Sequence, residues 1–296
     1  MKPTVVMIRT PGGTKYAQRI GHDLNKLDMS YLISSVEFFP AVFHKHPELN
    51  PDNTIIHPRA AHPNFSAPWL ASLKTYEDMG YRVFNQVATL MTTSNKLYIP
   101  NEEFYPQTWG VDKTKDSEIF GVWKLLQPVS DYVIKPYMSK SQGAHVMRFT
   151  RDMYLENSEL FAQIVKNTPH NPVVVQEFID YGYLHRVIIL NGKALPYVFT
   201  DQPDGERWKV SVCLNKETMY FNPKPPLTLL EFAEKAQNDV RGEINFIDIF
   251  EDRINMKYWV GEINTACNLS IHERLSGEDI SMEIAKTLKE LYENKI

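Results

Sequence analysis

The chain has 296 residues, of which 43% are hydrophobic and 23% charged, and its formal net charge is −4 at pH 7. This composition is ordinary for a globular protein of two or three small domains, and it excludes a predominantly disordered chain. The mild negative charge does not favour a nucleic-acid binder, since such domains usually carry a basic excess.

Two cysteines, Cys213 and Cys267, are too few for a disulfide framework or a Cys-rich zinc site, and they suit a reducing compartment. The apolar run at residues 4–8 is too short for a signal peptide and predicts a buried first strand. Because no run of about 18 apolar residues occurs, we expect no membrane span and a cytoplasmic location.

The first 90 residues predict a small α/β domain. The expected elements are strands at residues 4–8, 36–42 and 54–56 and a helix at residues 66–79, capped by Ser66. Residues 54–60, TIIHPRA, have the pattern of a strand that runs into a loop. That loop is either functional or a plain surface turn.

The rest of the chain predicts two further parts, residues 91–172 and 173–296. Helices are expected at residues 116–126, 157–166, 227–240 and 280–293. Strands are expected at residues 132–136, 173–178, 186–190, 208–213, 244–250 and 258–263. The pair Asn191-Gly192 favours a tight hairpin turn. Hairpins between helices indicate antiparallel α+β sheets after the α/β start.

The first segment with chemical character is residues 133–146, VIKPYMSKSQGAHV. Lys135 lies at the end of an apolar strand, where a solvated ammonium adds no stability, and a small polar turn with one glycine follows. Such a turn can present backbone N–H groups to phosphate oxygens, with the lysine as a point charge. A hairpin whose lysine extends along the surface explains the same residues.

The second segment, residues 173–180, is VVVQEFID, an apolar strand that turns polar at its end. Apolar walls with exposed backbone donors and acceptors suit a flat purine ring. An edge strand without a ligand explains the same residues, and for this segment on its own it is the preferred interpretation.

The third segment is the most specific. Two apolar strands carry Asp248 and Glu262, and Asn264 lies on the same face as Glu262 because the two are two residues apart. Two carboxylates buried together resist joint ionisation unless a cation is present. Mg²⁺ takes oxygen ligands and bridges to phosphates, so the pattern indicates a magnesium site, with an exposed polar hairpin as the alternative.

Together and in this order, these segments resemble the ATP-grasp superfamily, most closely its ribosomal-protein glutamate ligases and glutathione synthetase-like members. The resemblance covers roughly residues 80–285. It implies an α/β and α+β fold in three parts: a Rossmann-like pre-ATP-grasp domain and two subdomains that clamp the nucleotide. These parts are expected at residues 1–90, 91–172 and 173–296, with the phosphate-covering loop in the second and the metal ligands in the third.

The resemblance also implies roles for individual residues. The expected nucleotide-binding residues are Lys96, Lys135, Ser141, Gln142, Gly143, Gln176, Glu177, Phe178, Ile179 and Asp180. Backbone atoms of Glu177 and Ile179 would contact the purine edge. Arg186 and Lys209 are the expected catalytic residues, and Arg186 would contact phosphate or an acyl-phosphate intermediate. Asp248, Glu262 and Asn264 match the family's magnesium ligands, and Mn²⁺ is an alternative metal.

The chain departs from the family pattern at several positions. The glycine that often follows the Ser-Gln-Gly turn is replaced by Ala144, and a common Asp-x-Arg appears as Leu184-His185-Arg186. Asp180 is therefore the candidate for the ribose contact. Lys209 is carried over from a stretch in which relatives have Arg-Ser-Asn.

The activity that the resemblance implies is ATP-dependent ligation of a carboxylate to an amine through an acyl phosphate, with ADP and phosphate as by-products. The expected partners are a carboxylate donor and an amine acceptor, which is a small molecule, a peptide or a protein, and a homo-oligomer is expected by analogy. Two alternatives stay open: a kinase or phosphotransferase of the same fold, and an inactive nucleotide-binding regulatory protein.

Overall fold

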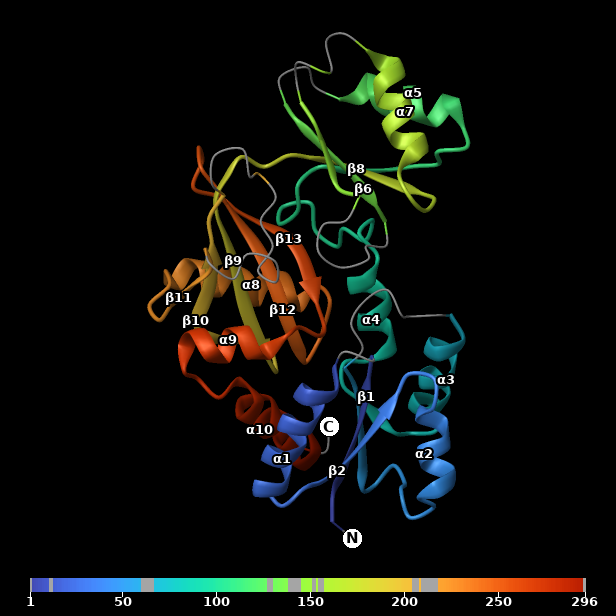
Figure 1. Cartoon of the computed structure of the whole chain (residues 1–296), viewed down its shortest axis with the longest axis vertical. Helices are drawn as coiled ribbons and strands as arrows, with labels where there is room; N and C mark the ends of the chain where they lie inside the picture. Colours follow the sequence, from blue (N-terminus) through green and yellow to red (C-terminus); the bar gives the residue numbers. More distant parts are fainter. Residues whose placement is uncertain are drawn as a thin grey trace.

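The computed structural model describes residues 2–10, 13–59, 67–126, 130–137, 145–150, 153, 157–203, 208 and 218–294. Figure 1 shows an elongated molecule built around three sheets, with the N-terminal sheet at one end and the sheet that contains β6 and β8 at the other. The fold is mixed α/β. No helix in the described ranges combines the length and the apolar character needed to cross a membrane.

The N-terminal sheet is parallel, with strand order β2-β1-β3-β4. Its strands are β1 (Thr4–Arg9), β2 (Ser30–Ser35), β3 (Thr54–Arg59) and β4 (Arg82–Val83). Its helices are α1 (Thr14–Lys26), α2 (Phe39–Lys45) and α3 (Ala67–Asp78), and α4 (Val87–Ser94) follows β4. Successive strand residues point to opposite faces. Met7 accordingly packs in the cluster that contains Leu24 of α1, and Ile8 packs in the cluster that contains Phe39 of α2.

One expectation for this region was wrong, and one helix was not predicted. Residues 36–42 do not form a strand, because a turn at Val36 leads into helix α2, where Pro40 lies in the first turn and its missing N–H costs nothing. The strand is instead Ser30–Ser35, whose serines hide the apolar pattern. Helix α1 also escaped the sequence analysis, because Gly13 at its start gives no side-chain cap signal. Ser66, the expected cap of α3, lies outside the described residues.

The central sheet is antiparallel, with strand order β5-β8-β6-β7. Its strands are β5 (Thr108–Val111), β6 (Tyr132–Pro136), β7 (Met147–Phe149) and β8 (Val173–Glu177). Helices α5 (Asp116–Leu125) and α7 (Ser158–Asn167) pack on it, and Asn157 caps α7 by accepting a hydrogen bond from the backbone of Leu160. The expected helices and strands of this region are confirmed to within a few residues.

The C-terminal sheet is also antiparallel, with strand order β11-β10-β9-β12-β13. Its strands are β9 (Tyr181–Leu190), β10 (Lys193–Asp201), β11 (Tyr220–Asn222), β12 (Ile244–Asp252) and β13 (Tyr258–Asn264). Asn191 and Gly192 both have positive φ in the β9–β10 turn, which confirms the expected hairpin. The expected strand at residues 208–213 lies outside the described residues, except for Trp208.

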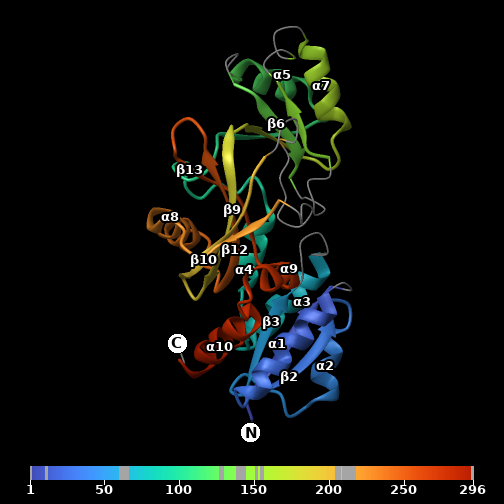
Figure 2. The same ribbon diagram turned by 60° about the vertical axis from the view of Figure 1, so that its left-hand side comes forward.

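Helices cover both faces of the C-terminal sheet. Helix α8 (Leu227–Asn238) packs on one face, and α9 (Leu269–Ser276) and α10 (Ile280–Glu293) pack on the other. The second group shares one hydrophobic cluster with α1 and β1, so the N-terminal and C-terminal sheets are joined by a continuous core. Figure 2 shows α10 beside α1 and α9 above the N-terminal sheet.

Candidate functional site

Three charged side chains form one row across the C-terminal sheet. Asp248 of β12 is the Cα partner of Arg186 on β9 and of Glu262 on β13. Residues that lie opposite each other on neighbouring strands share a face, so the three side chains leave the sheet together. Arg186 holds Asp248 in a two-pronged ion pair, Nε to Oδ1 and Nη2 to Oδ2, each at 2.7 Å.

A fourth charge, Lys96, extends this row. Lys96 lies in the segment between α4 and β5, and its Nζ donates to Glu262 Oε1 at 2.9 Å. Positive and negative charges therefore alternate along the row, from arginine to aspartate to glutamate to lysine. Each carboxylate is paired with its own cation. This pairing offsets the repulsion between two partly buried carboxylates.

Asn264 lies two residues after Glu262 on β13, on the same face and partly buried. Asp248, Glu262 and Asn264 offer oxygen donors only, and this donor set fits Mg²⁺. Within the described part of the chain, no group of three or more His, Cys, Asp or Glu side chains is arranged to hold a metal ion. Asp248, Glu262 and Asn264 are the residues of this site that could hold a hard cation.

The pKa values of this site follow from burial and neighbouring charge. Burial raises the pKa of Asp248, and Glu262 adds to that effect while Arg186 opposes it. Burial, reinforced by Lys96 and opposed by Glu262, lowers the pKa of Lys135 to about 7. The site therefore holds a lysine whose charge depends on pH near neutrality.

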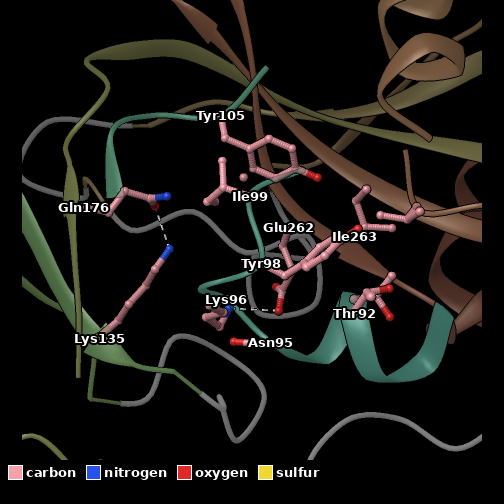
Figure 3. Close-up of a pocket in the computed structure, with 13 residues that line it drawn as sticks. Thr92, Asn95, Lys96, Tyr98, Ile99, Tyr105, Lys135, Gln176, Glu262 and Ile263 are labelled. Carbon is pink, nitrogen blue, oxygen red and sulfur yellow. Dashed lines mark hydrogen bonds and ion pairs between the residues drawn. The ribbon is translucent and has the colours of Figure 1, made fainter. Parts of the chain in front are cut away.

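Lys135 comes from β6 of the central sheet and faces Lys96 and Glu262, one end of the charged row, across a pocket (Figure 3). Its Nζ donates to Gln176 Oε1 at 2.6 Å, and Gln176 Nε2 in turn donates to Thr108 Oγ1 at 2.8 Å. The residues that line the pocket are Thr92, Thr93, Asn95, Lys96, Tyr98, Ile99, Tyr105, Lys135, Gln176, Val240, Gly261, Glu262 and Ile263. The pocket thus lies between the two antiparallel sheets, with the end of α4 on one side.

The segment after β8, which the sequence analysis assigned to adenine, joins the two antiparallel sheets. The N–H of Glu177 donates to Gln107 O at 2.9 Å, so the main chain of Glu177 can offer a purine only its carbonyl. Ile179 is buried in the core, whereas Asp180 is exposed. Phe178 is partly buried.

An arginine that the sequence analysis missed lies over Phe178. The guanidinium carbon of Arg148 is 3.9 Å from the centre of the Phe178 ring, and Arg148 Nε donates to Asp131 Oδ2 at 2.7 Å. The N–H of Phe178 donates to Asp131 O at 2.9 Å. No sequence signal could have found this group, because it depends on the pairing of β6 with β7 and β8.

The departure at residues 184–186 has a clear structural result. Leu184, which stands where relatives have aspartate, is buried in the hydrophobic cluster shared with α1. His185 points to the other face, where its ring nitrogens contact Thr200 Oγ1 at 2.9 Å and Glu251 Oε2 at 2.8 Å. Leu184 shares a face of β9 with Arg186 but has an apolar side chain, and His185 lies on the opposite face, so neither supplies a carboxylate beside Arg186.

The remaining expected residues are Ser141, Gln142, Gly143 and Lys209, and they lie outside the described residues. The described residues of the expected site fall into two groups. Arg186, Asp248, Glu262 and Lys96 are in contact with one another, and Lys135 and Gln176 form the opposite wall. Thr108, which orients Gln176, was missed because one threonine in an unmarked strand carries no signal.

No protein-family model matches the sequence, and no curated protein matches it. Solved structures do resemble the chain. The D-cycloserine synthetase DcsG is 12% identical and matches 98% of this chain and 99% of its own, with a TM-score of 0.70. An ATP-grasp ligase associated with ribosomally made peptides, from Chryseobacterium gregarium and solved with ADP and a leader and core peptide, is 13% identical over 98% of this chain and 97% of its own, with a TM-score of 0.70.

A third structure is the ATP-grasp ligase PsnB, complexed with a minimal precursor, Mg and ADP. It is 12% identical, matches 98% of each chain and has a TM-score of 0.69. At these identities the likeness shows the fold, and it extends over nearly the full length of all three proteins. The chain is therefore similar to the ATP-grasp superfamily and has the fold of ATP-grasp ligases.

Proposed function

We propose that this protein is an ATP-dependent ligase that joins a carboxylate to an amine through an acyl phosphate and releases ADP and phosphate. The observation that carries the proposal is the alternating row of Arg186, Asp248, Glu262 and Lys96, whose Glu262–Lys96 end faces Lys135 across the pocket. Such a row provides carboxylates for a cation and cations for phosphate in one place. The fold it shares with ATP-grasp ligases supports the same activity.

The nucleotide would occupy the pocket between the two antiparallel sheets. Lys96 and Lys135 would contact its phosphates, and the segment from Gln176 to Asp180 would bind adenine and ribose. The turn at residues 141–143 would cover the phosphates. PsnB and the C. gregarium ligase were both solved with ADP, which supports a nucleotide in the corresponding part of this chain.

The residues that would hold Mg²⁺, or Mn²⁺ in its place, are Asp248, Glu262 and Asn264. When bound, the metal would neutralise phosphate charge and so lower the barrier to attack by an anionic carboxylate. For this to happen, Arg186 and Lys96 must exchange their present carboxylate partners for substrate oxygens. The arrangement allows this exchange, because Arg186 contacts Asp248 and Lys96 contacts Glu262, and both carboxylates are proposed metal ligands.

Arg186 would stabilise the charge that develops on the transferred phosphoryl group and on the acyl phosphate, with Lys209 as a second contact. A fixed guanidinium in a partly buried site needs little reorganisation as charge develops. Arg186 is 5% exposed, so the side chains packed around it limit the movement of its guanidinium when it changes partners. Removal of one such preorganised donor typically lowers kcat by about 100-fold to 1,000-fold.

We further infer a division of labour among three parts. Residues 1–90 would form a Rossmann-like pre-ATP-grasp domain, and residues 91–172 and 173–296 would be the subdomains that clamp the nucleotide. The amine acceptor would include peptides, because PsnB was solved with a minimal precursor and the C. gregarium ligase with a leader and core peptide.

The test is ATP turnover with Mg²⁺ against pools of amino acids, polyamines and short peptides, with hydroxylamine as a trap. Release of ADP and phosphate that depends on a carboxylate, together with hydroxamate, would support the ligase. ADP formed without phosphate, with a phosphorylated hydroxyl product, would assign a phosphotransferase instead. ATP binding without turnover in every pool would favour a regulatory protein.

A further inference from the structure

Two arginines lie side by side at the ends of the central strands of the N-terminal sheet. Arg9 ends β1 and Arg59 ends β3, and the two are Cα partners in the parallel pairing. On its other side Arg9 is paired with Ser35, the last residue of β2. Because paired residues share a face, both arginine side chains leave the sheet on the same side.

The two arginines stand where the order of the strands reverses. From β1 the chain passes through α1 to β2 on one side of the sheet, and then through α2 to β3 on the other side of β1. Helices α1 and α2 pack on opposite faces. In open α/β sheets, ligands bind outside the carboxyl ends of the strands at this reversal. These ends point toward α9 and the C-terminal sheet (Figures 1 and 2).

Arg59 is a buried cation that lacks a counter-ion of its own within the described chain. The residue is 6% exposed, Nη2 donates to Cys267 O at 2.6 Å, and the guanidinium carbon lies 5.2 Å from the centre of the Tyr16 ring. Glu273, the carboxylate whose charge acts on Arg59, is paired with Arg19 at 2.7 Å. A buried charge is unfavourable unless it is paired, and a guanidinium has five N–H donors to offer.

The start of α1 adds a second feature that favours an anion. This helix of 13 residues begins at Thr14, beside Arg9 and Arg59. The N-cap residue Gly13 makes no side-chain cap hydrogen bond, and the first turn carries no acidic residue. The positive end of the helix dipole therefore favours negative charge in the same place.

This cluster adjoins the charged row of the C-terminal sheet. Cys267, which accepts the hydrogen bond from Arg59, follows Asn264 by three residues, a span of at most about 11 Å of chain. The hydroxyl of Tyr16 lies 2.9 Å from Ser270 Oγ and so connects α1 to α9. One extended substrate can therefore reach from the arginines to the proposed metal ligands.

We infer that Arg59, with Arg9 and the start of α1, binds a carboxylate of the substrate other than the one that ATP activates. The inference rests on the proposed ligase function and assigns the substrate class: a dicarboxylic acid, an acidic amino acid or a peptide with a further free carboxylate. A guanidinium is suited to this role because its planar fork matches the two oxygens of a carboxylate.

The test measures the melting temperature of the full-length protein without nucleotide, so that it does not depend on turnover. The probes are L-glutamate, glutarate and the dipeptide Ala-Glu, matched against L-glutamine, Ala-Gln, sodium chloride and inorganic phosphate at equal ionic strength. The variants are R59Q, R59K and R82Q. Arg82 is the matched control, because it also donates to main-chain carbonyls and stacks on a tyrosine, but at the C-terminal helix.

The wild type and R82Q are expected to melt about 2 °C or more higher with the probes that carry the extra carboxylate, and not with their amide counterparts. R59K is expected to respond weakly and R59Q not at all, while both keep the Mg-ATP affinity of the wild type. The inference is overturned if R59Q responds like the wild type, if phosphate gives the same shift, if the amides match the acids, or if no acid shifts the wild type. If the wild type shows no ATP turnover, the proposed ligase activity is refuted, but the melting-temperature response to carboxylates is unaffected.

Discussion

Nucleotide binding is expected to place a proton on Lys135. In the free protein, burial and the charge of Lys96 lower the pKa of Lys135 to about 7. At pH 8 about nine tenths of these side chains are therefore neutral. Phosphate oxygens beside the amine would restore its pKa toward the usual value of about 10.4, so binding of ATP at pH 8 should take up about 0.9 proton.

The direction of the pH effect follows from the same values. Because the lysine must be protonated to bind phosphate, affinity should be constant well below pH 7 and fall as pH rises through and above 7. The factor for one group approaches tenfold per pH unit, which gives about a 50-fold weaker affinity at pH 9 than at pH 7. The free energy of unfolding moves the other way: it is reduced while the buried lysine stays charged and rises between pH 7 and the usual lysine pKa.

The assay is isothermal titration of Mg-ATP at pH 8 in HEPES and in Tris, whose different ionisation enthalpies report the number of protons exchanged. K135R is the matched control, because an arginine stays protonated throughout this range. It should take up about 0.9 proton fewer than the wild type, and its affinity should hardly change with pH. Equal proton uptake by the wild type and K135R would refute the reasoning.

Three other substitutions test separate parts of the structure. E262A should abolish Mg-dependent turnover with the fold intact by circular dichroism, and full activity would remove Glu262 from the metal set. N85A should lower the free energy of unfolding by about 2–4 kcal/mol in urea titrations, because Asn85 bonds both main-chain groups of Ile244; a change below about 0.5 kcal/mol would contradict this. T108V should lower it by about 1–3 kcal/mol and weaken ATP binding, because the Gln176 amide loses its acceptor; an unaltered ATP affinity would separate Thr108 from the site.

The sequence singled out two members of the charged row, Asp248 and Glu262, because strand geometry is regular. Glu262 and Asn264 share a face through the period of two, and the apolar residues around Asp248 mark a buried strand. One long helix was equally clear from the sequence: the helix predicted at residues 280–293 is found with the same bounds, and Asp279 caps it. For these strands and for this helix, the residues that predict the element lie within it or within a few positions of it in the sequence.

The pairings between distant segments could not be predicted in this way. The ion pair of Arg186 with Asp248 depends on the register of β9 against β12, and nothing local to either strand determines it. The same holds for Arg59. The sequence predicted that its strand runs into a loop, but the burial of Arg59 depends on α1 and on Cys267, which lies 208 residues later. Residues 36–42 were misread because a proline in a first helical turn looks like a strand end.

The charge balance of the site favours an enzyme that exchanges partners over a rigid scaffold. Three basic side chains, Lys96, Lys135 and Arg186, meet two carboxylates, Asp248 and Glu262, so the free site has a small positive excess. For stability alone, apolar residues in place of the buried pairs would often serve as well or better. With Mg²⁺ and ATP bound, the carboxylates would turn to the metal and the basic groups to the phosphates, which leaves few charges unpaired in either state. A site whose charges are paired both without and with its ligands can release its products. A turnover cycle requires such release, whereas a permanent nucleotide anchor does not.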